Sequence, residues 1–222
     1  MILSMLKKEF RLVGRSFNSL VSVLVLILTF TFIFHFSVEG NFSGKTQGLA
    51  QAYIGMKWAF VFLVAFVYIG QSIWEERESG ASRVNELYIQ PWMFYLVKSL
   101  VIFLVLSLVS VFTILAFFMF FEHFELSLSS FWAHIIFLVP GMLSLSFLGV
   151  TLGLISSSSR LKEILLPLLL IPFSVPVLLF GMGAEKKYWT NPEGLLTSSL
   201  VMVSFAIFYG AFGALLYEIS SE

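Results

Sequence analysis

The sequence predicts an all-α integral membrane protein with about six transmembrane helices, and three observations support this class. Hydrophobic residues make up 59% of the 222 residues and charged residues 12%, whereas soluble domains have about 45–50% and about 25%. The mean hydropathy is +0.95. Six segments approach or exceed the roughly 20 apolar residues that cross a bilayer. Because backbone polar groups in lipid must bond within their own segment, these spans are expected to be helices.

We expect two parts in the chain. Residues 1–19 form an interfacial helix, and residues 20–222 form a single transmembrane domain without a soluble domain or a long linker. The Trp residues fall at or just beyond the span ends, where indole rings prefer the membrane interface. The predicted spans are 20–38, 54–73, 96–121, 131–155, 164–182 and 195–217.

Residues 1–19 show the pattern of an amphipathic helix on the inner leaflet, with apolar residues at steps of three and four. A cleaved signal peptide is the alternative interpretation, but the lead-in is long, the apolar run is overlong and a small-residue cleavage site is missing. The apolar face would hold Leu3, Leu6, Phe10, Val13 and Phe17, and the opposite face Lys8, Arg11 and Arg15.

The Lys and Arg residues predict the orientation, because they concentrate in cytoplasmic loops. Six spans put both termini on one side, and that side would hold nine of the 13 basic residues. Both termini are therefore expected to be cytoplasmic. The net charge of +0 gives no overall field that favours a nucleic-acid partner. The nine are Lys7, Lys8, Arg11, Arg15, Arg77, Arg83, Lys98, Arg160 and Lys162; the other four are Lys45, Lys57, Lys186 and Lys187.

The cytoplasmic loop at 74–95, between the second and third spans, has the densest charge in the chain. Gly80 and Pro91 are helix breakers, and the segment between them has one apolar and one polar face. It is either an ordinary solvated loop or a short coupling helix that receives force from a cytoplasmic motor. The candidate coupling residues are Glu75, Glu76, Glu78, Gly80, Arg83, Glu86, Leu87, Tyr88 and Pro91.

The fifth predicted span contains half of the six prolines, at Pro167, Pro172 and Pro176. Each proline frees a carbonyl one turn earlier and tends to kink a helix. The span is therefore either packed around static kinks or acts as a gating helix that bends or breaks.

No complete nucleotide-binding or catalytic motif is present. Residues 40–46 resemble a phosphate-binding loop but are one residue short. A partner must therefore supply the energy of ATP hydrolysis, and the chain is not expected to be an enzyme. The predicted span interiors are nearly free of ionisable groups, which argues against a proton-coupled transporter.

Three histidines, His35, His123 and His134, map to the predicted outer side. Histidine there can ligate haem iron, but a lone histidine at an interface is more commonly a polar interfacial residue. His123, flanked by two glutamates, is the weak candidate, and no ligand-spacing motif supports it. With no cysteine in the chain, thiolate metal sites are excluded, and no metal site is expected.

Three of these features together resemble a known family. They are the basic lead-in at 8–12, the charged loop from Gly80 to Pro91 with Lys98 entering the third span, and the proline-containing run at 171–180. The chain is similar in these features, in length and in span count to cytochrome c maturation protein B, or haem exporter protein B, within the ABC-2-type permease group.

The resemblance implies an ABC-2-type permease architecture in the bacterial inner membrane. The protein would be the permease subunit for haem export or delivery in c-type cytochrome biogenesis, with haem as a possible cargo and no directly bound cofactor. Its partners would be a cytoplasmic ABC ATPase, a haem-handling membrane subunit, a periplasmic haem chaperone and a second copy of itself. The alternatives are an ABC-2-type permease for a lipid, polysaccharide or drug, and a motor-free assembly scaffold.

Overall fold

The computed structural model describes residues 2–15, 17–39, 46–78, 90–121, 128–157, 162–190 and 195–219. Every element within these ranges is an α-helix. They are α1 (Ile2–Arg15), α2 (Phe17–Glu39), α3 (Thr46–Glu78), α5 (Pro91–Phe120), α6 (Leu128–Ser157), α7 (Lys162–Thr190) and α8 (Leu195–Ile219).

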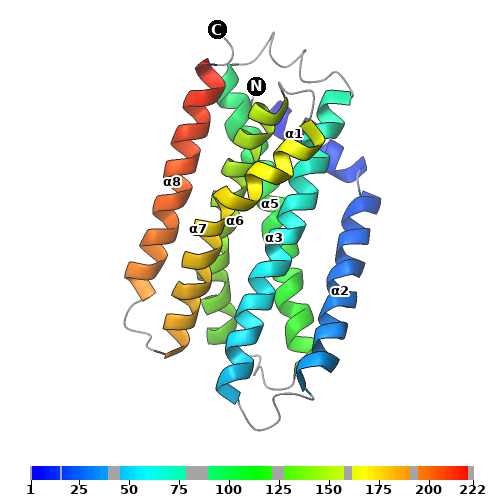
Figure 1. Ribbon diagram of the computed structural model, residues 1–222. Helices are drawn as coiled ribbons and strands as arrows, with labels where there is room; N and C mark the ends of the chain where they lie inside the picture. The colour runs from blue at the N-terminus through cyan, green and yellow to red at the C-terminus, as the bar shows by residue number, and fades with distance from the viewer. Residues whose placement is uncertain are drawn as a thin grey trace.

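The six long helices run alternately up and down in one bundle (Figure 1). The short helix α1 lies across one end of this bundle, where α8 also finishes. We call this the terminal end, and the opposite end the distal end. Helices α3, α5, α6, α7 and α8 are long and apolar enough to cross a membrane, and α2 adds a shorter apolar stretch, Val21–Ser37. The predicted class, an all-α membrane protein, is confirmed.

Helix α6 lies at the centre of the bundle and packs against α3, α5, α7 and α8. Its apolar window is 67% buried, whereas those of α7 and α8 are 29% and 28% buried. Large side chains such as Leu168 on α7 and Ile207 on α8 are exposed. Lipid solvates these side chains as well as a protein core would, so the outer helices need no further apolar cover.

Buried hydroxyl groups bond to the backbone of their own helices. Thr31 donates to the Ile27 carbonyl, Ser110 to that of Leu106, and Thr113 to that of Val109, over 2.7 to 2.9 Å. Each donor lies four residues after its acceptor, as expected for Ser and Thr inside a membrane helix. These polar side chains therefore need no partner from lipid.

Small residues allow close contacts between α6 and its neighbouring helices. A Cβ atom at Gly149 would lie 2.5 Å from Ile69, and one at Gly153 would lie 2.1 Å from Ile73. Helices α6 and α3 therefore approach through these two glycines. On α8, Gly210 faces Phe147 of α6. These contacts lie within one chain.

Several helix boundaries differ from the prediction, and α3 begins at Thr46 rather than 54. Helix α5 begins at Pro91 rather than 96, because proline suits the first helical position, where its missing N–H is not needed. Helix α7 continues to Thr190 rather than 182. The predicted outer loop at 184–194 therefore contributes two further helical turns to α7, although its charged residues lower the hydropathy there.

We predict that Gly213→Ala destabilises the bundle. Its Cβ would lie 2.2 Å from both the Tyr95 hydroxyl and Thr151 Oγ1. Tyr95 is fully buried, and its hydroxyl donates to the Tyr209 carbonyl over 3.1 Å. Overpacking of this kind costs about 1–3 kcal/mol. The melting temperature of the purified protein in detergent should fall. Gly183→Ala is the control, since nothing lies within 4 Å of its Cβ; equal losses in both variants would contradict the prediction.

Candidate functional site

The predicted coupling loop, 74–95, connects α3 to α5 at the terminal end of the bundle (Figure 1). Glu75, Glu76 and Glu78 lie in the last turn of α3. Pro91 is the first residue of α5, where Gln90 precedes it in extended conformation. The coupling role of all nine candidates stays a prediction, and five of them lie outside the described residues: Gly80, Arg83, Glu86, Leu87 and Tyr88.

A buried ion pair joins the helices on both sides of this loop to α1. Lys98 Nζ on α5 lies 3.2 Å from Glu9 Oε2 on α1, and it donates to the Ser72 carbonyl of α3 over 3.3 Å. Glu9 and Lys98 are both buried. We call these three residues the terminal junction. It connects α1 directly to the end of α3 and the start of α5.

A helix begins the chain as predicted, but α1 ends at Arg15 rather than at residue 19. Val13 packs against the core, whereas Phe10 is 48% exposed. Glu9 points inward, because Lys98 offers its buried carboxylate a charged partner. Apolar periodicity alone does not detect an inward-facing carboxylate of this kind.

The predicted gating helix, α7, is continuous through its three prolines. Pro172 is exposed and Pro176 is half-buried, while Pro167 lies in the first part of the helix. Proline nitrogen carries no hydrogen, so the backbone ladder is weakened around these positions. Tyr209 of α8 donates a hydrogen bond to the Phe173 carbonyl over 2.9 Å. A side chain from the neighbouring helix therefore supports α7 in the interval between two prolines.

Four buried side chains meet near the distal end, and we call them the distal cluster: Lys57 and Trp58 of α3, His134 of α6, and Glu185 of α7. Lys57 donates to Glu185 Oε1 and forms an ion pair with it. His134 Nδ1 lies 2.5 Å from the same oxygen. The Trp58 indole N–H donates to Glu185 Oε2 over 2.7 Å. Both carboxylate oxygens of Glu185 are thus bonded.

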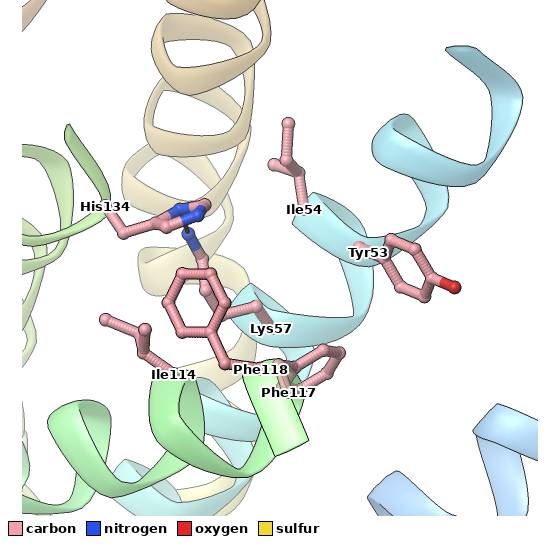
Figure 2. A pocket seen from close by; sticks show the side chains of 7 residues that line it. All are labelled: Tyr53, Ile54, Lys57, Ile114, Phe117, Phe118 and His134. Carbon is pink, nitrogen blue, oxygen red and sulfur yellow. Dashed lines mark hydrogen bonds between the residues drawn. The ribbon is translucent and has the colours of Figure 1, made fainter. Parts of the chain in front are cut away.

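His134 Nδ1 also lies 2.8 Å from Lys57 Nζ. Figure 2 shows the Lys57 side chain directed at the imidazole ring. A ring nitrogen has one role at a time: it donates when it carries a proton and accepts when it does not. Nδ1 therefore either donates to Glu185 or accepts from Lys57. The imidazole lies where it can serve as an alternative partner for the lysine.

The space next to Lys57 and His134 is small and mostly aromatic. A cavity of about 10 Å³ is lined by both residues and by Tyr53, Phe117 and Phe118, among others. This is about the size that one water molecule needs. The Tyr53 hydroxyl points away from the lysine (Figure 2). The cluster is therefore enclosed by apolar surfaces, where electrostatic interactions are strong.

A cluster of this kind is not required for stability. Replacing a buried ion pair by apolar residues of similar volume is commonly neutral or stabilising by about 1–4 kcal/mol, whereas removing one partner costs about 3–5 kcal/mol. The best-attested role of such groups is to fix one arrangement of helices or to switch between two. Here the arrangement is that of α3, α6 and α7.

The histidines differ in their surroundings. His35 on α2 lies among aromatic rings, with ring centroids 5.4 Å from Phe36 and 5.3 Å from Phe121. The weak haem-ligand candidate, His123, lies outside the described residues. His134 belongs to the distal cluster, where its Nδ1 lies 2.8 Å from Lys57 Nζ.

Sequence analysis missed the distal cluster. Lys57 and Trp58 were placed at the outer surface, but Trp58 is fully buried and Lys57 is 4% exposed. The statement that span interiors are nearly free of ionisable groups is therefore wrong for this end of the bundle. Glu185 fell in the loop after the fifth predicted span, which ended at residue 182. The sequence feature that could have indicated the distal cluster was Glu185, the single acidic residue that follows the apolar run of α7.

The bundle, its lipid-facing surfaces and the buried ionic contacts at both ends define a multi-pass α-helical membrane protein. The chain matches the family model described as CcmB protein over residues 1–213, and it therefore belongs to that family. This agrees with the resemblance seen in the sequence. The family is one of permease subunits with a haem-export role in cytochrome c biogenesis. No curated protein and no solved structure matches the chain significantly.

We predict that Lys57→Met is more destabilising than Lys57→Met combined with Glu185→Met. The single change leaves a buried carboxylate without its cation, at a cost of about 3–5 kcal/mol, whereas the double change removes both charges. Thermal unfolding in detergent should therefore show a larger fall for the single variant. Lys187→Met, at an exposed position on α7, serves as the control. A double variant less stable than the single one would contradict the prediction.

Proposed function

We propose that this protein is the membrane permease subunit that couples ATP hydrolysis in a partner ATPase to haem export or delivery during c-type cytochrome biogenesis. Its membership of the CcmB family supports the permease role. The observation that carries the coupling is the terminal junction, where Lys98 connects α1, α3 and α5 beside the predicted coupling loop. The energy source is a partner because no complete nucleotide-binding motif occurs in the sequence.

In this proposal the protein lies in the bacterial inner membrane with the terminal end in the cytoplasm. The excess of Lys and Arg on that side supports the orientation. The ATPase contacts residues 74–95 there. A haem-handling membrane subunit and a periplasmic haem chaperone are the other partners, and a second copy of the chain completes the permease.

Force applied to the coupling loop would reach the bundle through rigid elements. Pro91 belongs to the predicted coupling loop and is also the first residue of α5. Displacement of the loop therefore moves this helix directly. The Lys98 contacts with Glu9 and the Ser72 carbonyl make α1 and α3 move with it. A motor shifts such an equilibrium only when it binds one arrangement better than the other. The nucleotide state of the ATPase would provide that difference.

Helix α7 would supply the gate. The backbone hydrogen bonding of α7 is weakened around Pro172 and Pro176. This would let the distal part of the helix change direction relative to the first part. The hydrogen bond from Tyr209 to the Phe173 carbonyl would hold this part of α7 in one of its two directions.

We expect Glu86→Arg to lower co-purification of the ATPase by about tenfold or more, because an unfavourable charge at an interface costs several kcal/mol. Pro91→Ala should reduce it less, by removing the fixed start of α5. The measurement is recovery of the ATPase, and its hydrolysis rate, with the tagged chain from cells that express the whole complex. Lys187→Gln, at the distal end, is the control.

Normal recovery and normal hydrolysis with both variants would refute the coupling role. A chain that never recovers an ATPase would instead be a motor-free scaffold. If the chain recovers an ATPase but deletion of the chain leaves haem attachment to cytochrome c unaffected, the protein would be a permease for another cargo.

Pro176→Ala should restore a backbone N–H for the Pro172 carbonyl and stiffen α7. We expect ATPase recovery to stay normal while the yield of haem-stained cytochrome c falls several-fold. Leu179→Ala, at an exposed position on the same helix, is the control. An unchanged cytochrome yield in Pro176→Ala would show that the prolines of α7 serve only static packing.

A further inference from the structure

Helices α3 and α7 are separated by an apolar groove. Its volume is about 450 Å³. Among its lining residues are Gly55 and Phe62 of α3 and Leu178 and Met182 of α7. Along this stretch the two helices are therefore incompletely packed against each other.

Beside the distal part of this groove, where Gly55 and Trp58 line it, polar contacts join the two helices. Lys57 and Trp58 both bond to Glu185. The Trp58 ring also lies close to Gly181, where an added Cβ would be 2.4 Å from it. Glu185 follows Pro176 on α7, so it lies on the part of the helix beyond the last proline. Any change in the direction of that part must break the contacts of Glu185.

Breaking an isolated buried ion pair would leave Lys57 without a partner at high cost. His134 changes this, because its Nδ1 lies 2.8 Å from Lys57 Nζ. With Glu185 in place, Nδ1 donates to the carboxylate; with Glu185 withdrawn, the ring carries its proton on Nε2 and Nδ1 accepts from the lysine. Lys57 then has a hydrogen-bond partner in both arrangements. The other titratable side chain at the same cavity, Tyr53, points away.

We propose that Lys57, His134 and Glu185 form a releasable latch that holds α3 and α7 together beside the distal part of the groove between them. When the distal part of α7 moves, Glu185 leaves and His134 takes over Lys57. The groove then opens to water at its distal end. The proposal rests on the proposed function only in that the partner ATPase would drive the release.

The chain contains no cysteine, so one introduced thiol reports on the groove without background. Gly55→Cys is suitable because Gly55 lines the groove and nothing lies within 4 Å of an added Cβ there. The measurement is the rate at which a membrane-impermeant maleimide labels this thiol in nanodiscs. Thermal unfolding of each variant confirms that the labelled protein is folded.

In the isolated protein, Glu185→Gln should raise the labelling rate by about tenfold, which corresponds to a shift of about 1.4 kcal/mol in the opening equilibrium. His134→Phe should lower the rate below that of the parent, because Lys57 then has no second partner when the latch opens. Lys186→Gln, at an exposed position next to Glu185, should leave the rate unchanged. General loosening of the fold would raise the rate in both cluster variants.

The latch is therefore refuted if His134→Phe accelerates labelling, or if Glu185→Gln has no effect. A second measurement adds the partner ATPase with and without ATP. In the parent the labelling rate should depend on ATP, and in the Lys57→Met and Glu185→Met double variant it should not. Opposite effects of the two single variants without any ATP dependence would support the latch and count against the proposed coupling to the ATPase.

Discussion

A bilayer offers no hydrogen-bond partners to polar groups, and this constraint governs how the chain places each of them. Backbone groups are satisfied within long helices, and the buried hydroxyl groups of Thr31 and Ser110 donate to carbonyls of their own helix. The buried charged side chains are handled differently. Lys57 and Glu185 meet at one end of the bundle, and Lys98 and Glu9 meet at the other. Each pair joins separate helices, so meeting the constraint also fixes how those helices are arranged.

The two ionic sites have different structural consequences. The terminal junction connects α1, α3 and α5 beside the predicted coupling loop. The distal cluster connects α3, α6 and α7, and its histidine can serve either of two partners. Helix α3 takes part in both sites. A displacement at the terminal end therefore has a continuous helical path to the distal cluster.

The fold class was predictable because hydropathy depends on composition over about 20 residues, and lipid requires such segments to be helices. The distal cluster was not predicted. Its members are widely separated in sequence, and each one alone resembles an ordinary residue at a span end. The end of α7 was misplaced because its charged residues resemble those of a loop.

The sequence by itself determined the number and nature of the apolar segments, the membrane environment and the family, since these depend on composition and on local motifs. Only the tertiary structure decided which polar residues are paired. Trp58 became a buried donor to Glu185, and Glu9 turned inward to Lys98, because helix packing brought their partners within hydrogen-bond distance. The energy of a buried charge depends on what lies next to it in space, and adjacency in space is absent from a linear pattern.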